Sequence, residues 1–156
     1  MSEPRFIADE MLGSLARWLR IMGYDTMYAQ GMDDTEILHV ALEQDRRLLT
    51  RDRQLAQRAG EAGMLVSSDD AAEQLEDVIR TYRLEFREER SRCTRCNGPL
   101  TEVPGSEVGT EVPPRVRESQ DTFYRCTVCG QIYWKGTHWE RIVGQVGEAM
   151  RNAYSR

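Results

Sequence analysis

The four cysteines of this 156-residue chain are the residues whose spacing points most directly to chemistry, because they form two CxxC pairs. Cys93 and Cys96 make the first pair, Cys126 and Cys129 make the second, and 29 residues separate the pairs. Four thiolates in this pattern close a tetrahedron around zinc and leave no open coordination position. Two disulfides or a redox CxxC are the alternatives, but a reducing cytoplasm disfavours disulfides and a redox pair needs only one CxxC. The pattern therefore predicts structural Zn²⁺ in a small zinc ribbon.

Acidic residues form a second set, concentrated where each predicted strand gives way to a helix. They are Asp9-Glu10, Asp33-Asp34 with Glu36, Asp52, and Asp69-Asp70. Each of them alone is typical of a helix N-cap, which stabilises a helix by about 1 kcal/mol. Carboxylates crowded in one crevice repel one another unless a cation neutralises them, and such oxygen ligands suit Mg²⁺ or Mn²⁺. A bound ion of this kind activates water for attack on phosphate, so the set is typical of a nuclease.

The elements that would position these acids alternate between short strands and amphipathic helices over residues 1–83. We expect strands at 5–8, 25–29, 47–50 and 64–67, and helices at 12–22, 34–44, 52–62 and 71–82. Such alternation predicts an α/β fold with an open parallel sheet and helices on both of its faces. In that sheet every strand-to-helix loop lies at the carboxyl edge. A strand order of 2-1-3-4 would place Asp9 and Asp52 on either side of the switch-point crevice.

The composition changes near residue 85. Residues 85–92 are charged, with Phe86 as their only apolar residue, and this stretch is typical of a linker. Four of the five prolines and all the cysteines follow, and apolar residues spaced by three and four between 139 and 150 predict a last helix. We expect two domains, a sheet domain at 1–90 and a zinc ribbon with a C-terminal helix at 91–156. The apolar stripe of that helix packs either on the sheet domain or on a second chain.

The charge is divided unequally between these parts, although the whole chain carries −5. Residues 1–90 hold 19 acids against 12 arginines, net −7, whereas residues 91–156 hold 7 acids against 9 basic residues, net +2. The ribbon is thus the part expected to contact nucleic-acid phosphates. No apolar stretch approaches the roughly 18–20 residues of a membrane span, and the N-terminus lacks the apolar region of a secretory signal. These features predict a cytoplasmic protein that does not bind membranes.

Several motifs, in this order along the chain, resemble the Mut-seven C-terminal ribonuclease domain family. They are DEMLGSLARWLR at 9–20, GYD at 23–25, LTRD at 49–52, the two CxxC pairs, VPPRV at 112–116 and YWKGTHW at 133–139. The resemblance implies a PIN-like nuclease fold carrying a zinc ribbon and a metal-dependent ribonuclease activity. It also implies that Asp9 is the acid of the first strand, that Asp33 and Asp34 follow the second, and that Asp52 is the acid of the Thr-Arg-Asp motif.

The chain departs from the family at the positions that grip phosphate. The family has basic residues beside the first acid and in the first helix, where this chain has Glu10 and Ser14. Other arginines must then contact RNA, or lie on solvated faces instead. The candidates are Arg51 beside the acids, Arg17 and Arg20 in the first helix, and Arg115, Arg117 and Arg125 in the ribbon.

Three aromatic side chains near these positions carry a functional and a structural interpretation each, and for His138 the functional one is a metal ligand or a base. Trp18 and Trp139 stack on RNA bases or, more commonly for tryptophan at helical spacing beside leucine, belong to the core. His138 is interpreted as an aromatic-packed or surface residue, because four sulfurs already complete the zinc shell.

Together these residues predict a ribonuclease in which Asp9 and Asp52 bind Mg²⁺ or Mn²⁺. Asp33 or Asp34 completes the site or orients water, and Arg51 steadies phosphate. The main alternative is a non-catalytic RNA-binding module with a structural zinc ribbon. A phosphoacceptor receiver domain ranks lower, because it needs a lysine at a fifth strand end and the only lysine, Lys135, lies in the ribbon. The oligomeric state stays open.

Overall fold

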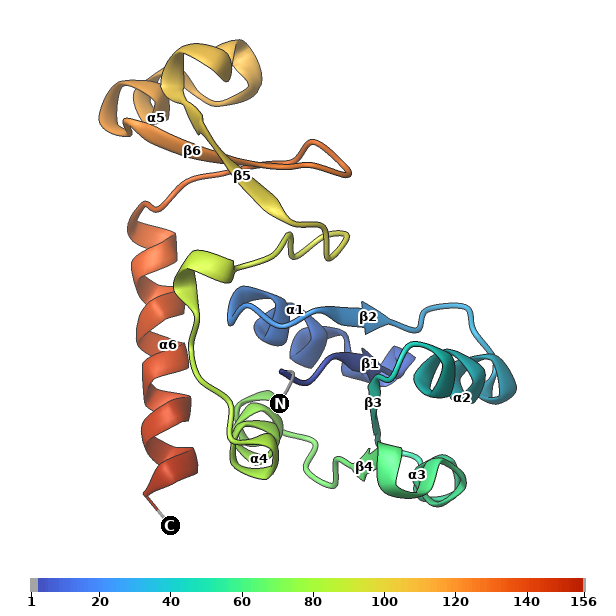
Figure 1. Ribbon diagram of the computed structural model, residues 1–156. Helices are drawn as coiled ribbons and strands as arrows, with labels where there is room; N and C mark the ends of the chain where they lie inside the picture. Colours follow the sequence, from blue (N-terminus) through green and yellow to red (C-terminus); the bar gives the residue numbers. More distant parts are fainter. Residues whose placement is uncertain (1–2, 156) are drawn as a thin grey trace.

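The computed structural model of the protein describes residues 3–155. Its first part is a parallel four-stranded sheet in the order β2-β1-β3-β4 (Figure 1). The strands are β1 (Phe6–Ala8), β2 (Thr26–Tyr28), β3 (Arg47–Thr50) and β4 (Gly63–Leu65). This confirms the α/β parallel sheet and the strand order expected from the sequence.

Helices cover both faces of this sheet. Successive strand residues alternate between the two faces, so the apolar strand side chains need a covering layer on each side. Phe6 and Leu49 point into a core with α1 (Gly13–Ile21) and α4 (Ala71–Tyr82), whereas Ile7 and Leu48 point toward α2 (Asp34–Glu43) and α3 (Arg53–Ala59). Short 3-10 helices precede α1 at Glu10–Leu12 and follow α3 at Gly60–Ala62. The central strands, β1 and β3 from Leu48 onward, are buried on both faces, as is usual for a parallel sheet, whereas the edge strands β2 and β4 are mostly half-buried.

The last helix, α6 (Thr137–Tyr154), runs beside α4 (Figure 1). Val146, Ala149 and Ala153 enter the same apolar core as α1 and α4. The C-terminal end of α6 is also hydrogen-bonded, since Arg80 Nε donates to Ala153 O at 3.0 Å and Tyr154 Oη donates to Leu84 O at 2.7 Å. Of the two expected positions for this stripe, the structure therefore shows the one on the sheet domain.

The cysteine-containing part forms an antiparallel sheet in the order β5-β6-β7. Its elements are β5 (Leu100–Pro104), α5 (Pro114–Ser119), β6 (Thr122–Cys126) and β7 (Ile132–Tyr133), with short 3-10 helices at Gly105–Glu107 and Gly109–Glu111. A small core of four buried apolar residues supports it: Val108, Val112, Phe123 and Ile132. The sequence indicated strands near β6 and β7 but not β5. That strand ends in a proline, and two of its five residues are exposed polar ones.

Residues 85–92 connect α4 to the first cysteine turn, and this connecting segment is bound to the sheet domain along its length. The backbone N–H groups of Arg87 and Arg92 donate to Met22 O and Arg20 O at 3.0 and 2.8 Å, and Ser91 Oγ donates to Ile21 O at 2.6 Å. Phe86 packs against the main core, and Glu88–Arg90 forms a 3-10 helix. A charged composition predicted solvent exposure, but backbone groups do not depend on composition and bind this segment to the end of α1.

None of the helices between residues 3 and 155 has the length and apolar character needed to cross a membrane. The cytoplasmic location stays a prediction.

Candidate functional site

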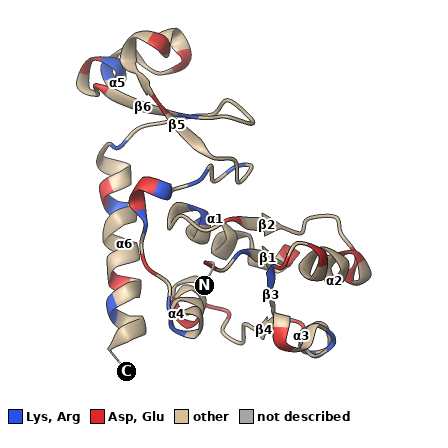
Figure 2. Ribbon diagram, in the orientation of Figure 1, with Lys and Arg blue, Asp and Glu red and all other residues tan. Residues whose placement is uncertain are grey.

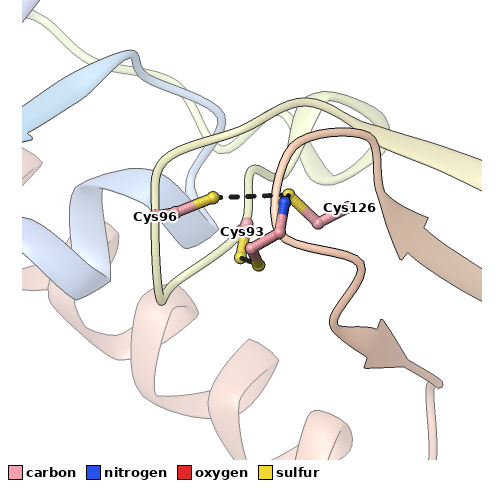
Figure 3. A group of neighbouring side chains, drawn as sticks. Cys93, Cys96 and Cys126 are labelled. Atoms are coloured by element: carbon pink, nitrogen blue, oxygen red, sulfur yellow. Dashed lines mark hydrogen bonds between the residues drawn. The ribbon is translucent and has the colours of Figure 1, made fainter.

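The four cysteine sulfurs lie within 4.8 Å of one another, as Figure 3 shows in part. Cys93 Sγ is 3.7 Å from Cys129 Sγ, and Cys96 Sγ is 3.4 Å from Cys126 Sγ. A tetrahedron with zinc–sulfur bonds of about 2.3 Å has sulfur–sulfur edges of about 3.8 Å, whereas a disulfide bond is about 2.05 Å long. The cluster therefore has the dimensions of a closed zinc site, and all four thiols are free of disulfides.

Backbone geometry at the two turns directs N–H groups at the sulfurs. The N–H groups of Val128 and Cys129 each donate to Cys126 Sγ at 3.4 Å. At Gly98 an added Cβ would lie 2.7 Å from this sulfur, so only glycine fits there. Burial is the largest influence on the pKa of Cys126 and acts to raise it, but the N–H donors and neighbouring thiols lower it to about 6. A thiol with this pKa gives up its proton readily to a metal at neutral pH.

The acids of the sheet domain lie at the carboxyl ends of the strands. Asp9, 8% exposed, follows β1, and its Oδ1 accepts from Met11 N at 3.1 Å. Its Oδ2 accepts from the hydroxyl of Thr50 and from Arg51 N at 3.2 Å. The Thr50 hydroxyl also accepts from Asp52 N at 3.0 Å. A single buried hydroxyl thus links the carboxylate of Asp9, after β1, to the backbone of Asp52, after β3.

Sequence reasoning did not single out Thr50. Its signal is the Leu-Thr-Arg-Asp motif, in which only Arg51 and Asp52 were predicted to act. Thr50 has no exposed surface, and a buried hydroxyl must find both a donor and an acceptor. Asp52 provides the donor locally, two residues after Thr50, whereas Asp9 provides the acceptor only because β1 and β3 are neighbours in the sheet.

Asp9, Asp33 and Asp52 each also cap a helix, as their positions in the sequence predicted. Asp52 Oδ1 accepts from Gln54 N and Leu55 N at 2.9 and 3.2 Å, and Asp33 Oδ1 accepts from Glu36 N at 2.9 Å. Asp34 lies exposed in the first turn of α2. In the part of the chain that the structure describes, the cysteines alone form a group of three or more metal-ligating side chains. The structure thus connects Asp9 with Asp52, and it does not bring Asp33 or Asp34 into a ligand cluster with them.

The sequence over residues 4–146 matches the Mut7-C RNAse domain. The chain belongs to the Mut7-C RNAse domain family. Neither a comparison with curated proteins nor one with solved structures finds a match. The match spans both the acidic edge and the cysteine cluster, and the family's description indicates a nuclease-like function with RNA as the substrate class.

Two further arginines of this Mut7-C domain are candidates for phosphate contact, Arg51 at the acidic edge and Arg17 on α1. Arg51 is half-buried; its Nη2 donates to Ser67 O at 3.3 Å, and its buried Nε has no hydrogen-bond partner within residues 3–155. Arg17 is exposed on α1 and donates to Ser14 Oγ at 3.2 Å. Contact of these two arginines with RNA stays a prediction.

Arg20, predicted to bind RNA, has a different role in the structure. It is 7% exposed, and its guanidinium donates to Thr26 O and Thr94 O at 2.9 Å each. It therefore attaches the first cysteine turn to β2, and its donors are directed away from solvent. The helical pattern placed Arg20 on a solvated face because it contains no information about the ribbon that covers that face.

A carboxylate strengthens the same junction. Asp25 Oδ1 accepts from Arg46 Nη1 at 2.9 Å and from Asn97 Nδ2 at 2.7 Å, while Asn97 Oδ1 accepts from Thr26 N at 3.0 Å. Asn97 lies in the left-handed region with φ of 72°, in the turn between Cys96 and Gly98. The zinc turn of this Mut7-C chain is thus fixed to the edge strand of the sheet.

The three ribbon arginines differ in how many of their donors already bind other groups of the protein. Arg115 and Arg117 are exposed on α5, part of whose ribbon is blue in Figure 2, and Arg117 Nη1 donates to Gly109 O at 2.6 Å. Arg125 forms a two-pronged ion pair with Glu111, with N···O distances of 3.1 and 2.7 Å. Arg115 and Arg117 are therefore the better placed of the three to contact a phosphate.

Proposed function

We propose that this protein is a metal-dependent endoribonuclease that hydrolyses RNA phosphodiester bonds at the carboxyl edge of its parallel sheet. The observation that supports this proposal most is the connection from Asp9 through the Thr50 hydroxyl to Asp52. It joins the ends of β1 and β3, between which the chain reverses its direction of progress across the sheet, and this switch point is where ligands of such sheets bind.

The two carboxylates suit a catalytic Mg²⁺ or Mn²⁺. Capping uses Oδ1 of Asp52, and within residues 3–155 its Oδ2 accepts no hydrogen bond, so that oxygen is available to a ligand. Mg²⁺ needs only one or two carboxylates, because water and substrate phosphates complete its shell. Asp9 and Asp52 would hold the ion, which would supply an activated water and neutralise charge at the phosphate.

The remaining residues of the proposed site bind and orient the substrate. Arg51 offers a guanidinium at the same edge, and its planar fork matches a phosphate. Asp33 or Asp34 orients the attacking water from the loop after β2. The zinc ribbon contributes RNA affinity through Arg115 and Arg117, which lie on its exposed helix.

Cleavage of labelled single-stranded RNA with Mn²⁺ or Mg²⁺ tests this proposal with Asp52→Asn. The variant keeps the cap, since asparagine caps about as well as aspartate, but it removes the charge that holds the ion. We expect the cleavage rate to fall by more than about 100-fold, because loss of outer-shell partners alone costs about 10–100-fold.

Asp70→Asn is the matched control. Asp70 caps α4 in the same way, by accepting from Glu73 N at 3.0 Å, and it lies at the same edge of the sheet. It should cleave RNA at the wild-type rate. Equal rates in Asp52→Asn and wild type would exclude the proposed site.

The alternative function is a non-catalytic RNA-binding module, and one observation favours it: Asp9, Asp33 and Asp52 all have a structural task as caps. In that case the purified wild-type protein would bind RNA and leave it intact.

Thermal melting of the protein with and without Mn²⁺ tests the metal site independently of cleavage. If Asp9 and Asp52 bind the ion, the rise in melting temperature caused by Mn²⁺ disappears in Asp9→Asn and Asp52→Asn.

A further inference from the structure

A cavity of about 810 Å³ lies between α1, the ribbon sheet and the beginning of α6. Trp18, Trp134 and Trp139 all line it, and these are the three tryptophans of the chain. Tyr124 and Tyr133 add two more aromatic rings. The volume falls within the range of about 300–1,000 Å³ that is usual for ligand pockets, and no residue of the acidic edge lines this cavity.

The aromatic rings are held in fixed positions by their neighbours. Tyr124 of β6 pairs with Tyr133 of β7, so the two side chains lie on one face of the ribbon sheet. Trp134 packs edge-on against buried Phe123, with ring centroids 6.3 Å apart. The indole N–H of Trp139 donates to Glu88 Oε1 at 2.8 Å. Such fixed rings offer flat surfaces for stacking at little entropic cost.

A cation already lies over two of the rings. Lys135 Nζ is 5.2 Å from the centroid of the Tyr124 ring and 5.9 Å from that of Trp139. Arg17 and Arg92 also line the cavity, and so do three acids, Glu88, Glu89 and Glu102, of which Glu88 pairs with Lys135 at 3.9 Å. The formal charges balance. The interior therefore suits a flat, uncharged ring with polar edges, while exposed Arg17 and Lys135 suit a phosphate beside it.

We propose that this cavity binds unstacked bases of single-stranded RNA and thereby restricts the enzyme to unpaired strands, an inference that rests on the proposed ribonuclease function. Bases in a duplex are paired and stacked and cannot enter a cavity, whereas bases of a single strand turn outward and stack on aromatic side chains. A nucleobase has the flat, uncharged, polar-edged form that the cavity fits. The backbone phosphates of the strand that carries the base match Arg17 and Lys135.

The position of the cavity agrees with a shared substrate strand. Helix α1 begins at Gly13, four residues after Asp9, and Arg17 and Trp18 lie on its second turn. With a rise of 1.5 Å per residue they are about 6–8 Å along the axis from the beginning of α1. A strand whose bases occupy the cavity can therefore continue along α1 to the acidic edge.

Tryptophan fluorescence tests the inference directly, since every tryptophan lines the cavity. The probe is an eight-nucleotide single-stranded oligouridylate, compared with an RNA duplex of the same length, added to full-length Asp52→Asn protein so that cleavage does not occur. We expect the single strand to change the emission and the duplex to leave it unchanged. The same single strand should protect Lys135, the only lysine, from reductive methylation.

Tyr124→Leu provides the matched variant. Loss of one stacking ring should weaken binding of the oligouridylate about 5- to 150-fold, while zinc content and circular dichroism stay as in the parent protein. Leu42→Ala is the control, because Leu42 is 72% exposed on α2, outside the cavity. It should bind as the parent does. In the cleaving protein, Tyr124→Leu should raise KM and keep kcat.

The outcomes separate this inference from the proposed function. Unchanged emission, an unprotected Lys135, or equal binding of single strand and duplex would overturn the base-binding cavity, even if Asp52 is needed for cleavage. If the oligouridylate changes the emission and Tyr124→Leu weakens binding of the oligouridylate, the cavity binds RNA bases. If the wild-type protein then cleaves no RNA, the proposed catalytic function is the part that fails.

Discussion

The sheet domain and the zinc ribbon are stabilised in different ways. The sheet domain buries two apolar clusters, one on each face of its strands, and its core includes Phe6, Leu19 and Leu49 with no exposed surface. The ribbon has only four buried apolar residues apart from its cysteines. A core of that size contributes little stability, so we expect the ribbon to depend on metal where the sheet domain depends on packing.

The comparison extends to charge and to the junction between the parts. Residues 1–90 carry −7 and place acids at one edge, whereas residues 91–156 carry +2. The two parts are nonetheless joined by the hydrogen bonds of Arg20 and Asp25 and by α6, which begins beside the ribbon and packs on α4. The residue 90/91 boundary stays a prediction, because α6 contributes to the core of the sheet domain.

The largest effect should come from removing a zinc ligand. Cys126→Ser should lose the single zinc per chain and the protection of residues 93–133 from hydrogen exchange, because metal binding supplies most of the folding free energy of such a site. The C-terminal turns of α6 should stay protected, since Val146 and Ala149 pack in the sheet-domain core. Metal analysis and hydrogen exchange measure these effects.

Val128→Ser is the control for this comparison. Val128 lies in the same turn with 71% of its surface exposed, and its substitution should leave the zinc in place. Zinc retained in Cys126→Ser, or exchange protection lost equally in both parts, would contradict the difference between them.

Loss of the junction carboxylate should have the next largest effect. Asp25→Asn removes the charge from the hydrogen bonds with Arg46 and Asn97, each worth about 1.5–3 kcal/mol with a charged partner and about 0.5–1.5 kcal/mol with a neutral one. The free energy of unfolding should therefore fall by about 2–3 kcal/mol. Burial is the largest influence on the pKa of Asp25 and acts to raise it, but the bonds from Arg46 and Asn97 lower it overall.

A lowered pKa in the folded state gives a definite pH dependence. The contribution of Asp25 is complete above the unfolded pKa of about 3.9 and is lost as the pH falls through the lower folded value. Urea denaturation should therefore show wild type and Asp25→Asn differing at neutral pH and converging below about pH 4. Asp45→Asn, at an exposed position, should follow wild type throughout. A constant difference between wild type and Asp25→Asn down to acidic pH would contradict this role.

The charge difference should appear in the salt dependence of RNA binding. Arg115→Ala and Arg117→Ala should each reduce the slope of log affinity against log salt by about 0.7, as one phosphate contact to a single strand is lost. Arg58→Ala removes the same charge from exposed α3 in the sheet domain and should leave the slope unchanged. Equal slopes for all three variants in anisotropy titrations would show that the ribbon does not provide the phosphate contacts.

The smallest effect concerns a single cap. Asp33→Ala should lower the free energy of unfolding by about 1 kcal/mol, because Glu36 N loses its acceptor, whereas Asp33→Asn should be nearly neutral. Denaturant midpoints measure both. If Asp33→Asn retains stability but slows cleavage, Asp33 orients water as well as capping α2. If both variants cleave as wild type does, its role is structural.

The sequence by itself determined the features that depend on local pattern. Apolar periodicity located the four parallel strands and their helices, and the fold class is confirmed. Spacing of the cysteines predicted one four-sulfur cluster, which the structure confirms at zinc dimensions. The caps at Asp33 and Asp52 followed from their position before helices, because an N-cap needs only the backbone two or three residues ahead.

The tertiary structure alone decided the contacts between residues far apart in the chain. Arg20 and Thr94 are 74 residues apart, and Asp9 and Thr50 are 41 apart, so no local pattern relates them. The same holds for residues 85–92, whose backbone bonds to α1 overrode their charged composition, and for the three tryptophans around one cavity. Such contacts form only after packing has brought the elements together, and spacing along the chain does not encode which side chains then meet.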